Sequence, residues 1–146
     1  MPKPFPVKSE PFERSNKGTT LCAKTAWSNA QNFGINLPRG NAYDAARETP
    51  ISSAFKKTVG SVDQPKKIST DFSKFASDSN FADIYTTSKS QYGHRAIAFL
   101  NQSDHQRYVL DPYSNKQKTD PIPLMEYQEK RGVIQANFYK SEYYVA

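Results

Sequence analysis

The chain has 146 residues, 36% of them hydrophobic, which suffices for one domain with one core and excludes a disordered chain. Its single cysteine excludes an internal disulfide, and no apolar run approaches the length that spans a membrane. The formal net charge of +6 favours anionic partners such as nucleic acid, acidic membranes or anionic cell-wall polymers.

The first segment, residues 1–17, is rich in Pro, Lys and Ser. Its prolines disfavour a regular helix, so the sequence predicts an extended N-terminal arm. The segment lacks the apolar stretch of a secretory signal peptide, and we therefore expect a protein made in the cytoplasm without such a signal. Residues 18–146 form a single predicted domain, because the sequence contains no internal repeat and no sign of a second domain.

A helix is predicted from about Thr20 to Phe33. Thr19 or Thr20 can cap its start through a side-chain hydroxyl, and Gly34 supplies the left-handed position that ends many helices. Cys22 then falls in the first turn, where the partial positive charge of the helix N-terminus favours thiolate over thiol. This placement makes Cys22 a candidate nucleophile, although a lone cysteine is more often a small buried hydrophobic residue.

The following elements are predicted in chain order. We expect a short helix over residues 42–48, capped by Asn41 and ended by Pro50, and helical turns within residues 51–61 and 71–76. Residues 61–79 are polar and irregular, which suits a binding surface. Strands are predicted over residues 81–86, 93–100, 107–110, 132–139 and 142–145, with a hairpin loop at 101–106 and a helical turn at 124–129. This order indicates an α+β domain with its helices packed on one side of an antiparallel sheet.

A cysteine nucleophile needs a base, and the base needs a group that orients it. The chain has two histidines, His94 and His105. His94 begins the most hydrophobic predicted strand, whereas His105 lies in a polar turn, where a solvated loop residue is the simpler interpretation. Asp111 ends the next strand, and a hairpin would bring it beside His94. Asp111 can then bond one imidazole nitrogen and leave the other facing the sulfur, or it is only a turn residue before Pro112.

Three segments carry a resemblance to a known group of proteins. They are Leu21-Cys22-Ala23-Lys24-Thr25-Ala26, Gly40-Asn41-Ala42-Tyr43-Asp44-Ala45 and Gly93-His94-Arg95-Ala96-Ile97-Ala98. With Asp111 on the next strand, they resemble the papain-like cysteine peptidases and amidases, in particular the CHAP and NlpC-type peptidoglycan hydrolases. The resemblance covers residues 18–112. The chain departs from the family pattern at Ala82, where glycine is usual, and in its long polar segment over residues 61–79.

The resemblance implies a papain-like α+β fold and an amide hydrolase. Cys22 would be the nucleophile, His94 the general base and then general acid, and Asp111 the group that orients His94. The Cys22 backbone N–H would supply part of an oxyanion hole, and Asn16 is a candidate for a further donor. The implied substrate is a peptidoglycan peptide or the sugar–peptide bond, cut in the periplasm or on the cell wall after delivery or release. A cognate inhibitor (immunity) protein is a candidate partner.

Two other functions fit the same sequence. A papain-like protease or transferase would use the same three residues on a protein substrate. A non-enzymatic basic module would bind single-stranded nucleic acid through its charge and the aromatic residues within 138–144, although strand aromatics more often fill a core. One cysteine and two scattered histidines offer no ligand pair at zinc spacing, and the chain has no glycine-rich phosphate loop. We therefore expect neither a metal nor another cofactor.

Overall fold

A computed structural model describes residues 3–4, 21–69, 72, 77–89, 91–111 and 121–144, with side chains from residue 26 onward within these ranges. The predicted arm over residues 1–17 and the predicted helical turn over residues 71–76 fall largely or wholly outside this part of the chain. Among the described helices, none is both long and apolar enough to cross a lipid bilayer.

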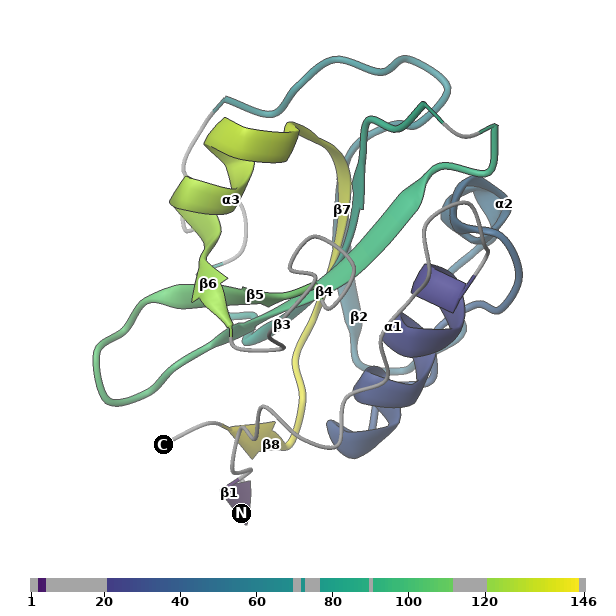
Figure 1. Ribbon diagram of the computed structural model, residues 1–146. Helices are drawn as coiled ribbons and strands as arrows, with labels where there is room; N and C mark the ends of the chain where they lie inside the picture. Colours follow the sequence, from purple (N-terminus) through teal and green to yellow (C-terminus); the bar gives the residue numbers. More distant parts are fainter. Residues whose placement is uncertain are drawn as a thin grey trace.

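A six-stranded antiparallel sheet forms the centre of the domain (Figure 1). Its spatial order is β2-β7-β3-β4-β5-β6. The strands are β2 Phe55–Gly60, β3 Phe81–Thr86, β4 His94–Leu100, β5 Arg107–Leu110, β6 Ile122–Pro123 and β7 Val133–Tyr139. A short parallel pair, β1 Lys3–Pro4 with β8 Tyr143–Tyr144, stands apart from this sheet. Every residue of β3 and β7 is buried, so both faces of the sheet are covered.

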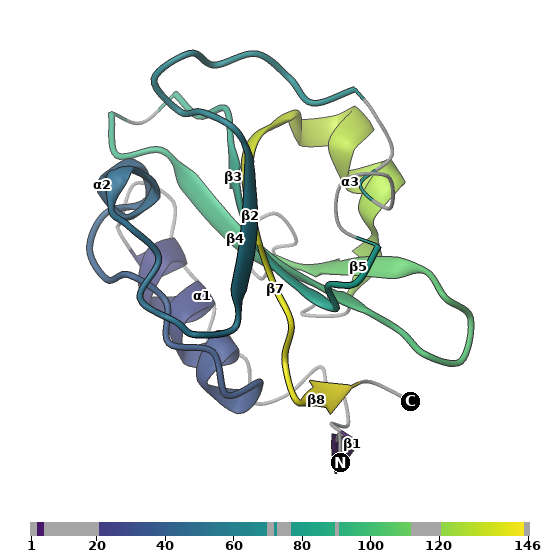
Figure 2. The same ribbon diagram turned by 180° about the vertical axis from the view of Figure 1, so that it is seen from behind.

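The helices cover opposite faces of this sheet (Figures 1 and 2). Helices α1 Leu21–Asn32 and α2 Ala42–Arg47 lie on one face, and α3 Leu124–Arg131 lies on the other. Side chains alternate along β4, so Ile97 and Phe99 pack with α1, whereas Ala96 and Ala98 pack with α3. The α+β class is confirmed, but the prediction that all helices pack on one side is wrong. It failed because the strands are apolar on both faces, which calls for a second covering layer.

The first helix ends as its sequence predicts. Gly34 has φ 71°, and the Ile35 N–H donates to the Ala30 carbonyl, so the chain closes the helix through a left-handed glycine. Ala26, Ala30 and Phe33 are buried along its inner face. Asn41 occupies the N-cap position of α2, but its side chain makes no capping hydrogen bond.

A buried ion pair joins two strands on the face that α1 covers. Arg95 of β4 donates from Nε to Asp83 Oδ1 (2.8 Å) and from Nη2 to Asp83 Oδ2 (2.9 Å). Its Nη1 donates to the Pro38 carbonyl (2.9 Å), and the Tyr85 hydroxyl donates to Asp83 Oδ2 (2.5 Å). Because these bonds satisfy both charges, the pair can be buried completely, and it fixes the segment after α1 against the sheet.

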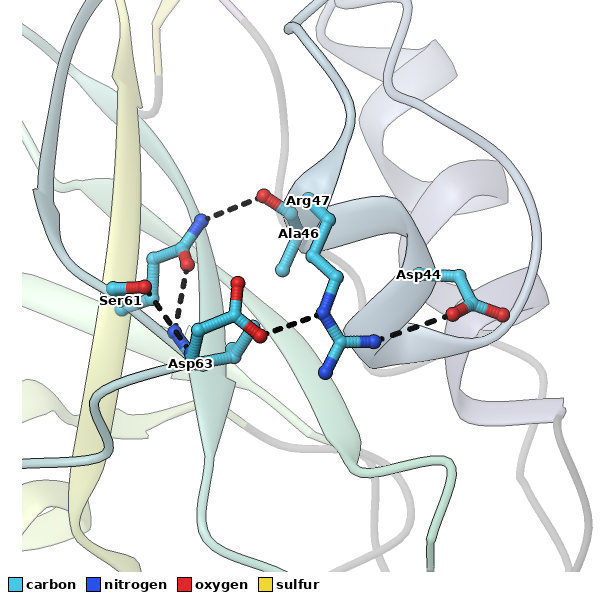
Figure 3. Close-up of polar contacts among 7 residues, drawn as sticks. Asp44, Ala46, Arg47, Ser61 and Asp63 are labelled. Carbon is cyan, nitrogen blue, oxygen red and sulfur yellow. Dashed lines mark hydrogen bonds and ion pairs between the residues drawn. The ribbon is translucent and has the colours of Figure 1, made fainter.

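Helix α2 is attached to strand β7 through one buried glutamine. Gln135 of β7 donates from Nε2 to the Ala46 carbonyl and accepts from the Val62 N–H, each at 3.0 Å. On the surface, Arg47 pairs with Asp63 at 2.8 Å and with Asp44 at 3.4 Å (Figure 3). These two ion pairs are exposed and contribute little to stability, so the buried Gln135 contacts are the ones that position α2.

Three elements differ from the sequence-based expectation. Residues 55–60 form the edge strand β2, not a helical turn, because they pair with β7 along their length. Residues 122–123 form a short strand that the sequence analysis did not predict. The predicted helical turn at 124–129 is the start of α3, which continues to Arg131 and stops at Gly132, where φ is 74°.

Candidate functional site

His94 occupies the first position of β4, directly after Gly93. Gly93 has φ 79°, and a Cβ at this position would lie 2.2 Å from the Tyr43 ring, so only glycine fits here. The Tyr43 hydroxyl donates to the Thr86 carbonyl at 3.1 Å, and the Tyr43 N–H donates to the Tyr92 carbonyl at 3.0 Å. Helix α2 thus fixes the point at which β4, and His94 with it, begins.

Asp111 directly follows β5, the strand that pairs with β4. The register places Leu110 opposite Ile97, in the middle of β4, so Asp111 continues toward Ala96 and lies diagonally across from His94 on the same face of the sheet. His94 Nε2 and Asp111 Oδ2 are 2.7 Å apart, and both side chains are almost completely buried, at 3% and 2% exposure. The predicted hairpin indicated this pair, and the structure brings the two residues together.

The contact fixes the chemical character of the imidazole. An ionised carboxylate only accepts hydrogen bonds, so His94 Nε2 carries the proton that Asp111 accepts. The other nitrogen, Nδ1, then has the lone pair in the neutral ring and is the atom able to take up a proton. Burial would raise the pKa of Asp111, but the hydrogen bond and charge of His94, the Tyr127 hydroxyl and the Arg131 charge hold it below its ordinary value.

Tyr127 of α3 is a third member of this group that the sequence analysis missed. Its hydroxyl donates to Asp111 Oδ2 at 2.6 Å, the same oxygen that His94 contacts. Burial, and then the Asp111 charge, raise the pKa of Tyr127 well above its ordinary value, so it stays protonated and remains a donor. The only sequence signal was its position inside a predicted helical turn, which says nothing about the carboxylate that it meets.

Cys22 is the second residue of α1, and its backbone therefore lies in the first helical turn, as the sequence predicts. The described side chains begin after it, so its sulfur lies outside the described atoms. The approximate position of the Cys22 backbone along the sheet can be traced from the other end of helix α1. There the rings of Phe33 and Phe99 are 6.1 Å apart. Eleven residues of helix before Phe33 span about 16 Å. Five residues of strand before Phe99 also span about 16 Å.

The first turn of α1 and the start of β4 therefore both lie away from the contact of Phe33 with Phe99, toward one end of the sheet. Both views of the ribbon show that α1 and β4 begin at the same end of the sheet, near α2 (Figures 1 and 2). The helix nevertheless packs on the face of Ile97 and Phe99, whereas the pair of His94 and Asp111 belongs with Tyr127 on the α3 face. A contact between Cys22 and His94 has to be made over the end of the sheet.

Comparison with protein families, with curated proteins and with solved structures found no match for this chain. The papain-like resemblance thus remains a prediction from three short segments and from the order of Cys22, His94 and Asp111. The α+β architecture and the contact between His94 and Asp111 come from the structure itself.

The remaining candidate residues lie elsewhere. Asn16, the candidate oxyanion donor, falls outside the described residues. His105 is exposed in the hairpin loop between β4 and β5, at the opposite end of these strands from His94. It has φ 57° and lines a surface hollow together with Arg107 and Met125. In the part of the chain that the structure describes, no three His, Cys, Asp or Glu side chains gather in a way that could hold a metal ion.

Proposed function

We propose that this protein is a cysteine-dependent amide hydrolase that acts on peptidoglycan, with Cys22 as nucleophile, His94 as general base and acid, and Asp111 as the orienting carboxylate. The observation that supports the proposal most is the buried 2.7 Å contact between His94 Nε2 and Asp111 Oδ2. It supplies a fixed imidazole whose Nδ1 can accept a proton, toward the end of the sheet where α1 begins.

The proposed reaction has two steps. The Cys22 sulfur, deprotonated by His94, attacks the amide carbonyl carbon, and the carbon–nitrogen bond breaks as protonated His94 gives its proton to the leaving amine. A water molecule then attacks the resulting thioester while His94 takes one of its protons. The carbon–sulfur bond breaks, releasing a carboxylic acid and restoring the thiolate and imidazolium pair. Asp111 stabilises the imidazolium in both steps without taking the proton.

The choice of peptidoglycan is supported by the resemblance and by the charge of the chain. A net charge of +6 favours association with the anionic polymers of bacterial walls. The same chemistry on a protein substrate is the competing outcome, which the substrate assay distinguishes.

The test is the release of soluble fragments from purified sacculi, identified by mass spectrometry, with casein as the protein substrate in a parallel reaction. We expect wild-type protein to release fragments with a newly exposed amine, and C22A and H94A to lose this activity by at least about a hundredfold, the lower range for general acid–base catalysis. The matched control is His105→Asn, because asparagine tolerates the left-handed backbone of His105. Equal fragment release by C22A would refute the proposal, and cleavage of casein alone would refute peptidoglycan as the substrate.

A further inference from the structure

We infer that Tyr127 is a positioning residue for His94 that acts through Asp111, an inference that rests on the proposed function for its catalytic meaning. The geometry is the reason. The Tyr127 hydroxyl (2.6 Å) and His94 Nε2 (2.7 Å) both contact Oδ2 of the Asp111 carboxylate, although they come from different elements of the fold. Two donors that converge on one oxygen leave the carboxylate little freedom to rotate, and this fixes the direction in which it holds the imidazole.

Helix α3 holds Tyr127 firmly enough for this role. The Tyr127 ring is 1% exposed and packs in the core with Leu124 and Val133. The next residue, Gln128, donates from Nε2 to the Ile68 carbonyl at 2.8 Å, which ties the helix to the segment after β2. Core packing holds the Tyr127 ring, and the Gln128 hydrogen bond holds the helix that carries it. The hydroxyl is therefore already oriented toward Asp111, and little conformational entropy is lost when the site acts.

The shared oxygen also has an electrostatic consequence. The charged and titratable groups that act on Asp111 include His94 from β4, and Tyr127 and Arg131 from α3. Tyr127 and His94 compete for the electron density of one oxygen, so the hydroxyl weakens the hold of Asp111 on the imidazole proton. Tyr127 thus keeps His94 able to release its proton to a leaving amine, which a stronger carboxylate contact would oppose.

The experiment follows the ring of His94 by ¹⁵N NMR as a function of pH in wild type and in Y127F. At pH values above the titration of the imidazolium, we expect the His94 ring of wild type to carry its proton on Nε2. In Y127F we expect the acid dissociation constant of the imidazolium to fall about tenfold, the ordinary scale for one hydrogen bond to a charged group. An unchanged or increased acid dissociation constant of His94 in Y127F would overturn the inference.

Tyr85→Phe is the matched control. Tyr85 is also buried and also donates to a carboxylate, Asp83, but it does so on the other face of the sheet. We expect Y85F to lose comparable stability and to leave the His94 titration as in wild type. If Y85F changed the acid dissociation constant of His94 as much as Y127F does, a general loosening of the core would explain the change without the Asp111 contact. That result would also overturn the inference.

A second readout uses the wild-type chain alone, so it does not depend on the folding of a variant. The Tyr127 hydroxyl proton should exchange slowly with water and show a nuclear Overhauser effect to the His94 ring, and the absence of this proton signal would count against the inference. Failure of the proposed function is a separate result. Hydrolysis by C22A would remove the enzyme proposal and leave the His94 titration as a valid test of what Tyr127 does to the imidazole.

Discussion

Asp111 accepts hydrogen bonds from His94 and Tyr127 while being nearly inaccessible to water. A buried carboxylate is costly unless its charge is compensated, and here the compensation outweighs the cost, since the pKa of Asp111 lies below its ordinary value. At this scale, a catalytic function and a purely structural one make different demands. In a structural role, the hydrogen bonds of His94 and Asp111 only have to be formed. In a catalytic role, His94 must in addition present its Nδ1 atom to a nucleophile.

The lowered pKa of Asp111 gives a stability prediction with a definite sign. A carboxyl whose folded pKa lies below its unfolded value of about 3.9 stabilises the fold above that pH, and this contribution is lost as the pH falls through the folded pKa. We expect Asp111→Asn to lower the free energy of unfolding by about 1–3 kcal/mol at pH 7. The difference from wild type should shrink below about pH 4. Urea denaturation at pH 7 and pH 3 measures it.

Asp104→Asn is the matched control, because Asp104 also accepts a hydrogen bond from a tyrosine, Tyr108, but lies exposed in the hairpin loop. It should change stability little at either pH. A destabilisation by D111N that is as large at pH 3 as at pH 7 would contradict the assignment of a charged, hydrogen-bonded Asp111.

At the scale of elements, the start of β4 is the part of the fold that positions His94. Gly93 bends the chain into the strand, and the Tyr43 ring from α2 occupies the space where a side chain at Gly93 would lie. The segment from Gly40 to Ala45, which carries part of the family resemblance, includes Tyr43, but the resemblance assigned no role to this residue. In the structure, the Tyr43 ring packs against Gly93, the residue that precedes the candidate base His94.

Gly93→Ala should therefore be strongly destabilising. Its positive φ and its contact with Tyr43 combine a backbone penalty with overpacking, about 2–5 kcal/mol in total. The control is Gly40→Ala, which has a positive φ (107°) but no atom within 4 Å of the added Cβ, so it isolates the backbone penalty. Thermal unfolding of both variants checks the prediction, and an equal loss in the two would show that the Tyr43 contact is unimportant.

The sequence predicted α1, the central strands and the contact of His94 with Asp111, because these depend on local signals: a left-handed glycine, apolar strands and one short hairpin. It did not predict the contact of Tyr127, which donates to Asp111 from helix α3 on the same face of the sheet. Nor did it predict β2, because the exposed residues Lys56 and Lys57 obscure the strand pattern at an edge. Strand β2 pairs with a strand far along the chain, as in the contact of Thr58 with Asn137, 79 residues later. Tyr127 is near Asp111 in the sequence, but no predicted hairpin joins them, so neither contact had a local sequence signal.

At the scale of the whole molecule, the sheet separates the two halves of the proposed site. Helix α1 and the buried pair of Arg95 and Asp83 lie on one face, and the group of His94, Asp111 and Tyr127 lies on the other. The proposed enzyme therefore requires the first turn of α1 to meet His94 over the end of the sheet. The reactivity of the Cys22 sulfur shows whether this contact exists.

The rate of alkylation by iodoacetamide between pH 5 and pH 10 measures this directly, because Cys22 is the only cysteine in the chain. If His94 lies against the sulfur, wild type should retain a reactive thiolate well below the ordinary thiol pKa of about 8.5, and H94A should lose at least about tenfold in rate at pH 6. His105→Asn should behave as wild type. A rate that follows an ordinary thiol pKa, identical in wild type and H94A, would contradict the account.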